Sequence, residues 1–502
     1  MASLQRAEEC LAAAKRLNSE LNAFISLIKQ PIARPPFITA RKPNSDGMTS
    51  EKRRLLHGLP LAVKDNIATT GLPTTCASGI LRNYISPFNA TIIDRLQEEG
   101  AVVVGKTNMD EFAMGSHTIH SHFGPVRQPA FESKTVSAGG SSGGSAVAVA
   151  TDQCQIALGT DTGGSVRLPA AYCGIVGFKP SYGLISRYGV IPYANSLDTV
   201  GILGKSVQDI GDVFKVINSS DERDPTCLSE GTRSRMEVQR SKHAYWGRRS
   251  GLRIGIPLEY NILELSPLVR QLWKQTAKML RDMGHTILPV SLPNTRNAPS
   301  SYFILAPAEA TSNLAKYDGV EYGSRLPEKG PVLYTATRSG GFGAEVRRRI
   351  LVGSYSLSSS AADNYFLQAQ RIRQLVRKDF DEVFTLPNPL RSLSTTTDVD
   401  ENGRVDFLLT PTTPSPPPLL DEAQSQDPLV ENTSDIFTIP SNLAGIPAIS
   451  LPVAVNEQEA RDAGCHVRSL GMQMIGQYGT DEWLLDVAKD TLHQLEGTKR
   501  LD

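Results

Sequence analysis

Residues 137–180 read SAGGSSGGSAVAVATDQCQIALGTDTGGSVRLPAAYCGIVGFKP. Two turns rich in glycine and serine, GGSSGGS at 139–145 and DTGGS at 161–165, flank the helix-like run AVAVA and the strand-like run QIALG. Glycine permits positive φ angles and lets backbone N–H groups approach a ligand closely. Two such turns in one neighbourhood indicate more than flexible connections between strands.

Two other interpretations of these turns stay open at this point. A phosphate-binding P-loop needs a lysine followed by serine or threonine after its last glycine, and Ser145 and Ser165 follow their glycines without one. A nucleophile elbow is matched literally by Gly139-x-Ser141-x-Gly143, although the preceding FESKTV is a poor strand. That interpretation would also require a histidine and an acid further along the chain.

Strands and helices alternate on both sides of this stretch. The run PLAVK at 60–64 predicts a short strand, residues 90–99 predict a helix, and AVVVG at 101–105 predicts a second strand. The same order of strand, helix and strand recurs between Gly251 and Val290 with clearer boundary signals. This order is typical of parallel strands in an α/β sheet.

The composition excludes several classes of protein. The 502 residues include 52 basic and 52 acidic side chains, so the surface as a whole is not a basic nucleic-acid footprint. No apolar stretch approaches the roughly 18 residues that span a bilayer. The six cysteines are scattered without a C-x-x-C pair, which predicts reduced, mostly buried thiols and not metal ligands.

Three segments at the edges of this pattern are harder to assign. Apolar residues at helical spacing over 4–14 predict a first helix, and a basic targeting segment is the alternative. Residues 228–251 form a polar surface insertion rich in arginine, which we interpret as a solvated loop, with an RNA or partner contact as the alternative. Residues 391–404 form a second polar insertion.

The combination of Lys64 with the two turns resembles the amidase signature family. The resemblance extends through HGLPLAVKDNI at 57–67 and AVVVGKTNMDEFAMGS at 101–116, and it covers nearly the whole chain. It implies an α/β fold with one large mixed β-sheet covered on both faces by α-helices. It also implies a single amidase domain over residues 1–502, with the two polar insertions on its surface.

The resemblance also implies a catalytic unit of two serines and a lysine. Ser165 matches the nucleophile, and Ser141 matches a bridging serine on a cis peptide bond, here Gly140–Ser141. Lys64 matches the base, which must be desolvated until its neutral amine is populated. A lysine at a strand end that pairs with Asp65 is the plain structural alternative.

Further positions match groups that stabilise and recognise the substrate. The oxyanion hole is implied to consist of the backbone N–H groups of Thr162, Gly163, Gly164 and Ser165. Arg349 matches the clamp for an α-carboxylate, Asp435 matches the partner of an α-amino group, and Tyr302 matches a further contact. A surface ion or a packed ring is the alternative at each position. Together they indicate a free amino acid as the amide donor.

Within the family, three segments are similar to the glutamine-hydrolysing subunits of tRNA-dependent amidotransferases: 179–201, 341–358 and 434–453. This implies that glutamine is hydrolysed here and that ammonia passes to a B-type kinase/transamidase subunit. That partner would use ATP and Mg²⁺ and hold the tRNA(Gln), with a small C- or F-type subunit beside it. No cofactor and no metal are implied for this chain.

Some functional alternatives remain at this level. His117, His120 and His122 are expected in a polar loop near the site mouth, with a metal site as the alternative. A free-standing amidase for small or fatty amides and a complex-building subunit without turnover are the rival functions. The insertions and the N-terminal segment favour a mitochondrial member of the family.

Overall fold

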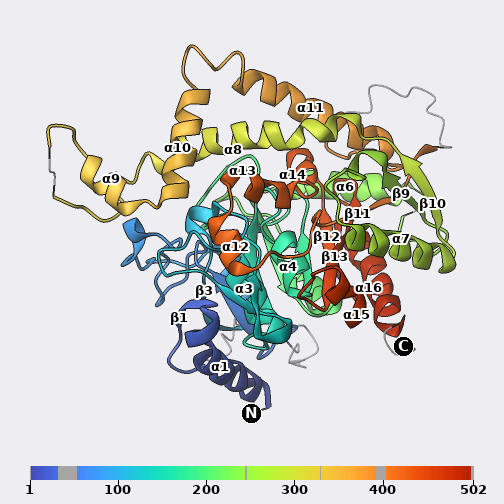
Figure 1. The fold of residues 1–502 in the computed structure, drawn as a ribbon, viewed down its shortest axis with the longest axis horizontal. Coiled ribbons are helices and arrows are strands. Elements are labelled where there is room, and N and C mark those ends of the chain that lie inside the picture. The colour runs from blue at the N-terminus through green and yellow to red at the C-terminus, as the bar shows by residue number, and fades with distance from the viewer. Residues whose placement is uncertain (1, 32–53, 244–245, 328–329, 392–402, 499–502) are drawn as a thin grey trace, which may run out of the picture.

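An eleven-stranded mixed sheet runs through the molecule, with helices packed against it (Figure 1). This computed structural model describes residues 2–31, 54–243, 246–327, 330–391 and 403–498. The strands are β1 (Phe24–Leu27), β2 (Pro60–Lys64), β3 (Val102–Thr107), β4 (Arg127–Pro129), β5 (Thr135–Ser137), β6 (Ile156–Asp161), β7 (Val176–Lys179), β8 (Thr199–Gly204), β9 (Arg253–Pro257), β10 (Thr286–Val290), β11 (Phe407–Pro411), β12 (Ala448–Ala454) and β13 (Ser469–Gly476).

The helices fall on both sides of this sheet. They are α1 (Ala2–Leu21), α2 (Thr91–Glu98), α3 (Gly143–Ala150), α4 (Arg167–Cys173), α5 (Val207–Ile217), α6 (Glu230–Ser241), α7 (Pro267–Asp282), α8 (Ala298–Leu314), α9 (Thr335–Gly341), α10 (Ala344–Ser356), α11 (Phe366–Val383), α12 (Leu420–Ser425), α13 (Pro428–Glu431), α14 (Ile439–Ala444), α15 (Glu457–Asp462) and α16 (Asp481–Thr498). Figure 1 shows α8, α10 and α11 together along one side of the molecule, with α1 at the opposite side.

The main sheet has the strand order β1-β3-β2-β6-β8-β7-β12-β13-β11-β9-β10. Strand β2 pairs in parallel with β3 and β6, and β9 pairs in parallel with β10 and β11. The strands between these two groups are antiparallel. The units β2-α2-β3 and β9-α7-β10 are the two parallel units that the sequence predicts, and the prediction of a large mixed sheet is confirmed.

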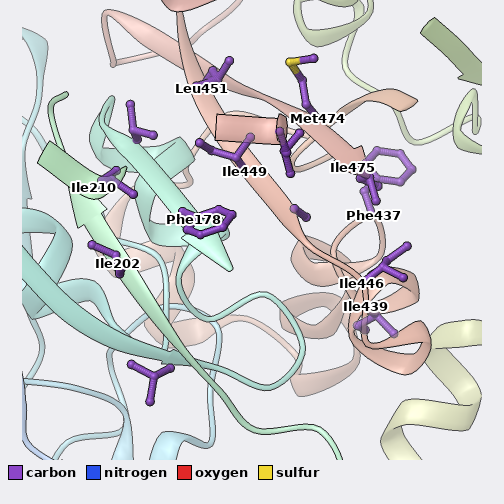
Figure 2. Close-up of a cluster of buried hydrophobic side chains, with 14 of the residues drawn as sticks. Phe178, Ile202, Ile210, Phe437, Ile439, Ile446, Ile449, Leu451, Met474 and Ile475 are labelled. Atoms are coloured by element: carbon purple, nitrogen blue, oxygen red, sulfur yellow. The ribbon is translucent and has the colours of Figure 1, made fainter. Parts of the chain in front are cut away.

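Successive side chains of each strand point to opposite faces of the sheet, so two hydrophobic cores form. Leu61 of β2 belongs to the larger core, whereas the next residue, Ala62, belongs to a smaller core that includes apolar side chains of α1 and α3. Figure 2 shows part of the larger core, where Phe178, Ile202 and Ile449 come from three neighbouring strands. Burial on both faces fixes the register of the central strands, because a slip by one residue would reverse every side chain.

The sheet brings the two glycine-rich turns to one edge. Lys64 is the last residue of β2 and Asp161 is the last residue of β6, and these strands are parallel neighbours. The carboxyl ends of parallel strands meet at the same edge of a sheet, where ligands bind in open α/β folds. Helix α3 starts within the turn at 139–145, and α4 follows the turn at 161–165. The two turns and the lysine therefore converge.

The basic insertion near 228–251 contains the helix α6, whereas the sequence analysis interprets it as a solvated loop. Several of its arginines bind groups within the chain. Arg233 donates to the Asn218 side chain, and Arg249 forms an ion pair with Asp490. The Asp490 carboxylate compensates the charge of Arg249, and the hydrogen bond holds Arg233 against the chain, so these two arginines are less available to an external partner.

Other sequence predictions concern the ends and the surface. The helix expected over 4–14 is part of α1, with Ala7, Leu11 and Ala14 buried. Most of the insertion predicted at 391–404 lies outside the described residues. None of the six cysteines forms a disulfide, and four are buried. Among the described helices, none is long and apolar enough to cross a membrane.

Close packing of α3 depends on Gly144. A Cβ atom added there would lie 2.3 Å from the carbonyl oxygen of Asn108 and 2.5 Å from that of Ala23. We predict that Gly144→Ala lowers the free energy of unfolding by about 2 kcal/mol or more, because backbone atoms must move. Gly211 in α5 is the matched control, since nothing lies within 4 Å of an added Cβ, and Gly211→Ala should be neutral or stabilise by up to about 1 kcal/mol. Denaturant titration measures both, and equal stabilities would contradict the packing argument.

Candidate active site

The amine of Lys64 is the innermost group of the candidate site. The side chain is fully buried, and its Nζ lies 2.8 Å from Oγ of Ser141, 2.8 Å from Oγ of Ser142 and 3.3 Å from the carbonyl oxygen of Thr160. A hydroxyl can donate as well as accept, so a neutral amine can take a proton from Ser141 along this contact. The geometry suits a lysine that acts as a base.

Burial sets the protonation of this lysine. Desolvation lowers the pKa of Lys64 from 10.5 to about 7, although the carboxylates of Asp110, Asp161 and Asp198 raise it. A pKa near 7 leaves a large fraction of the amine neutral at physiological pH, which a general base requires.

The plain alternative for Lys64, an ion pair with Asp65, is wrong. Asp65 points to the other side of the chain, where Oδ1 lies 3.6 Å from Nζ of Lys106 and Oδ2 accepts a hydrogen bond from the backbone N–H of Thr75 at 2.9 Å. The neighbouring residue thus fixes the loop after β2 and leaves the Lys64 amine to the two serines.

The turn at 139–145 places two buried serines beside the lysine. The peptide bond Gly140–Ser141 is cis, as predicted. A Cβ atom on Gly140 would lie 2.3 Å from Oδ2 of Asp110, so only glycine fits there. Ser142, to which the sequence analysis assigns no role, contacts the lysine as closely as Ser141 does. Its backbone N–H donates to the carbonyl oxygen of Ser165 at 3.2 Å and joins the two turns.

Asp161 holds the second turn. Its carboxylate accepts hydrogen bonds from Nε and Nη2 of Arg167 at 3.0 and 2.9 Å, from the backbone N–H of Val166 at 3.2 Å and from Nδ2 of Asn442 at 2.9 Å. Burial raises the pKa of Asp161, but Arg167 outweighs this and brings it to about 2. An ionised, fully engaged carboxylate orders the turn and is a poor proton acceptor.

Backbone amides of the second turn are free to bind a ligand. Within the described residues, the N–H groups of Gly163, Gly164 and Ser165 donate no hydrogen bond. The turn itself is fixed, because the Thr438 hydroxyl donates to the carbonyl oxygen of Gly163 at 2.6 Å and Gly164 has a φ of 146°. Rigid N–H groups without partners suit a developing oxyanion. Ser165 is 7% exposed, whereas Ser141 is fully buried, so Ser165 is the serine that a substrate can reach.

Two of the predicted recognition residues pack directly on this turn. A Cβ atom on Gly163 would lie 2.7 Å from the hydroxyl of Tyr302, and one on Gly164 would lie 2.6 Å from Oδ1 of Asp435. The Oδ2 atom of Asp435 accepts a hydrogen bond from Oγ of Ser116 at 2.6 Å, whereas the buried Oδ1 atom has no partner. Buried polar atoms are nearly always paired, so a free carboxylate oxygen here indicates a ligand with a donor.

Opposing effects act on the pKa of Asp435. Burial raises its pKa to about 7, the Ser116 hydroxyl lowers it, Asp161 raises it, and Arg167 and Arg349 lower it. A cation placed at Oδ1 would favour the ionised form further. The site is therefore suited to an ammonium group.

Arg349 of α10 is connected to the same turn through hydrogen bonds. Its Nη1 donates to the hydroxyl of Tyr193 at 2.7 Å, and its Nε donates to Oε1 of Glu345 at 2.6 Å. The backbone N–H of Tyr193 donates to Asp198, whose other oxygen accepts from the Thr162 hydroxyl at 2.7 Å. The guanidinium plane is thus fixed relative to the oxyanion turn. Sequence analysis missed these linking residues, although several stand in the segments 179–201 and 341–358 that carry the resemblance.

The three histidines of the HTIHSH motif do not converge. Nδ1 of His117 lies 2.8 Å from Oγ of Ser137, and Nε2 of His120 lies 3.2 Å from Oε2 of Glu431. His122 lines a polar cavity of about 280 Å³ together with His120. The described residues contain no group of three or more His, Cys, Asp or Glu side chains that could hold a metal ion.

The P-loop and elbow interpretations do not fit this geometry. Ser145 is fully buried, and its hydroxyl contacts the Thr107 hydroxyl at 2.7 Å and the carbonyl oxygen of Leu158 at 3.0 Å, so it cannot meet a phosphate. Ser141 is also fully buried, and it faces the amine of Lys64 where an elbow would require an imidazole.

Comparisons with known proteins give the relatives of this chain. The family model described as Amidase matches residues 6–485. The mitochondrial glutamyl-tRNA(Gln) amidotransferase A subunit of Coccidioides posadasii is 52% identical over 97% of this chain and 98% of its own. The protein of that name from Pyricularia oryzae is 55% identical over 85% and 87%. The crystal structure of the glutamyl-tRNA(Gln) amidotransferase A subunit from Thermotoga maritima superposes with a TM-score of 0.73 at 34% identity, covering 97% of this chain and 90% of that one.

The low pKa of Lys64 gives a pH prediction. Below pH 7 the amine is protonated and cannot accept the Ser165 proton, so the rate at which a fluorophosphonate modifies Ser165 should rise with pH, reach half its maximum near pH 7 and level off above pH 8. At pH 6 we expect about a tenth of the maximal rate. Lys64→Met should be slower by about 10²-fold or more and lose the inflection. A constant rate from pH 6 to pH 8 in the unmodified protein would show that Lys64 is not the base.

Proposed function

Because this chain belongs to the amidase family, we propose that it hydrolyses the side-chain amide of glutamine as the A subunit of a glutamyl-tRNA(Gln) amidotransferase. The observation that carries the substrate assignment is the buried, unpartnered Oδ1 atom of Asp435 beside the Ser165 turn. The ammonium group of a free amino acid supplies the missing donor. Relatives with the proposed name share about half of their residues with this chain over nearly its full length.

The order of the three side chains in the reaction is taken from the resemblance to the amidase signature family, and the Lys64–Ser141 contact at 2.8 Å fits that order. Oγ of Ser165 attacks the amide carbon while its proton moves through the Ser141 hydroxyl to the neutral amine of Lys64. The oxyanion binds to the backbone amides of Thr162, Gly163, Gly164 and Ser165. Lys64 then returns the proton to the leaving nitrogen, so that ammonia departs and an acyl-enzyme remains. Water attacks this ester with the same base, releases glutamate and restores Ser165.

Recognition of glutamine uses both charges of its amino-acid head group. Asp435 binds the α-ammonium group, and the guanidinium of Arg349 binds the α-carboxylate in a planar two-oxygen contact. The positive charge of Arg349 helps to lower the pKa of Asp435. Tyr302 packs against Gly163 of the oxyanion turn, where it would contact the bound substrate. An amide whose head group is held by these residues is therefore favoured at Ser165.

The ammonia serves a partner, since the relatives are named as subunits of an amidotransferase. A B-type kinase/transamidase subunit would use ATP and Mg²⁺ to amidate Glu-tRNA(Gln), assisted by a small C- or F-type subunit. This chain itself uses no cofactor. Its net charge of zero and the internal contacts of the arginines near 228–251 favour a tRNA held mainly by the partner.

We place the protein in the mitochondrial matrix, because the matching relatives are named mitochondrial. We also treat residues 1–502 as one amidase domain, since the family model runs through residues 6–485 and a single main sheet contains strands from both ends of the chain. The polar insertions near 228–251 and 391–404 then lie on its surface.

The rival function is a free-standing amidase for small or fatty amides. Such substrates carry neither an α-ammonium nor an α-carboxylate group, so they would leave Asp435 Oδ1 unpaired and the Arg349 guanidinium without a ligand. A complex-building subunit without turnover is the second rival. It gives no reason for a buried lysine with a pKa near 7 beside two serines.

The role of Ser165 as the nucleophile can be tested in the intact complex. The protein purified with its native partners should convert Glu-tRNA(Gln) to Gln-tRNA(Gln) with ATP and glutamine, and Ser165→Ala should lower this conversion by about 10³-fold or more. Ammonium chloride should restore conversion in the Ser165→Ala complex, because the serine is needed only to release ammonia. Full glutamine-dependent conversion by the variant would rule out Ser165 as the nucleophile.

The roles of Arg349 and Asp435 at the head-group site can be tested by substitution. Arg349→Ala and Asp435→Ala should each reduce kcat/KM for glutamine by about 30-fold or more, since each removes one of two charge-assisted contacts. Arg347→Ala, two residues away on the exposed face of α10, is the matched control and should retain nearly full activity. Ammonia release measures all three. Unchanged glutaminase activity in both site variants would favour the free-standing amidase.

A further inference from the structure

Ser116 links the candidate α-amino site to a charged pair, the buried Glu431 and the half-buried His120. Its hydroxyl donates to Oδ2 of Asp435 at 2.6 Å, and its backbone N–H donates to Oε1 of Glu431 at 2.9 Å. The other oxygen of Glu431 lies 3.2 Å from Nε2 of His120. Ser116, Glu431 and Asp435 are all buried, so water does not compete for these contacts.

We propose that Ser116, held in place by Glu431, is a positioning residue that directs one oxygen of the Asp435 carboxylate at the substrate, and that it thereby makes the site selective for amides that carry an α-ammonium group. This inference rests on the proposed function, because it concerns the same pocket. None of these three polar contacts involves Ser165, Ser141 or Lys64.

The two oxygens of the Asp435 carboxylate have different surroundings. A carboxylate can rotate, and a single donor on one side determines which oxygen remains free. The Ser116 hydroxyl has one proton and gives it to Oδ2, so Oδ1 stays unpaired and faces Gly164, next to the nucleophile. Without that hydroxyl, both oxygens would be buried without a partner, and the group would turn or take up a proton. Either change weakens binding of an ammonium group.

Glu431 and Asp110 fix the loop that carries Ser116. Burial lowers the pKa of His120, but Glu431 and Asp110 outweigh this and raise it to about 9, so the ring is a cation. Burial raises the pKa of Glu431, but His120 brings it to about 2. The ion pair joins the last residue of α13 to the loop. Asp110 accepts the backbone N–H groups of Thr118 and His120 at 2.9 and 3.0 Å and holds the same loop from the other side.

The test compares glutamine with glutaramate, which is glutamine without its α-amino group. Both are assayed by ammonia release from the complex purified with its partners. We expect the unmodified complex to prefer glutamine, and Ser116→Ala to lower the ratio of the two kcat/KM values about tenfold, mainly through KM for glutamine. The kcat/KM value for glutaramate should change little. An unchanged ratio, or an equal fall for both substrates, would overturn the proposal, because a merely structural role affects both alike.

A second pair of variants guards against misfolding. Glu431→Ala should lower the ratio of the kcat/KM values for glutamine and glutaramate as Ser116→Ala does. Glu431→Gln keeps an acceptor for the Ser116 N–H, so this variant should retain most of the preference for glutamine. Ser121→Ala is the matched control on the same loop, since its hydroxyl donates to Asn108 at 2.7 Å and not to Asp435. A reduced ratio in Ser121→Ala, or equal ratios in the two Glu431 variants, would count against the positioning role.

Failure of the proposed function is distinguishable from failure of this inference. If the unmodified complex releases no ammonia from glutamine, or hydrolyses glutamine and glutaramate with equal kcat/KM, the α-ammonium site itself is wrong. If the unmodified complex prefers glutamine and only the Ser116→Ala result disagrees, the function stands and the positioning role falls.

Discussion

The burial of one amine at the end of β2 is the constraint on which the rest of the site depends. Taking a lysine out of water disfavours its cationic form, and this lowers the pKa of Lys64 to about 7. Such a group needs hydrogen-bonding partners that are themselves buried, and Ser141, Ser142 and Thr160 supply them. The parallel pairing of β2 with β6 brings those partners to the lysine. The glycines of the turn allow the chain to close over it without a clash.

The buried carboxylates near Lys64 favour its cationic form, so their negative charge must be offset by other contacts. Three carboxylates act on Lys64, and unpaired they would hold it in the cationic form. Asp161 is neutralised by the bidentate contact with Arg167, and Asp198 is bound by the Thr162 hydroxyl and two backbone amides. Each of these interactions also shapes the oxyanion turn or its connection to Arg349. The carboxylates that affect the pKa of Lys64 therefore also hold the oxyanion turn and its connection to Arg349.

The sequence predicts individual strands and helices well, but it predicts poorly which strands pair and which side chains meet in the fold. The strand β2 matches the predicted run PLAVK residue for residue, because this run is apolar and ends in a polar turn. The antiparallel centre of the sheet carries no such local signal, since its strands are buried on both faces and pair across long stretches of chain. The same limit applies to the site. Two serine-rich turns and a strand-end lysine predict the catalytic unit through their resemblance to the amidase signature family, whereas the contacts of Ser116 and Ser142 depend on partners that only the fold brings near.

The proposed recognition residues come from a part of the chain far from the nucleophile. Tyr302, Arg349 and Asp435 all lie more than 130 residues beyond Ser165 in the chain. Helices α8 and α10, which carry Tyr302 and Arg349, pack against each other, so two long segments hold the head-group site as one body. A lysine with a pKa near 7 can support hydrolysis of any amide that reaches Ser165. Under the proposed function, specificity comes from residues that favour an amide whose head group carries both charges. The free Oδ1 atom of Asp435, whose carboxylate is held by the Ser116 hydroxyl, is the group that the proposal assigns to the α-ammonium contact.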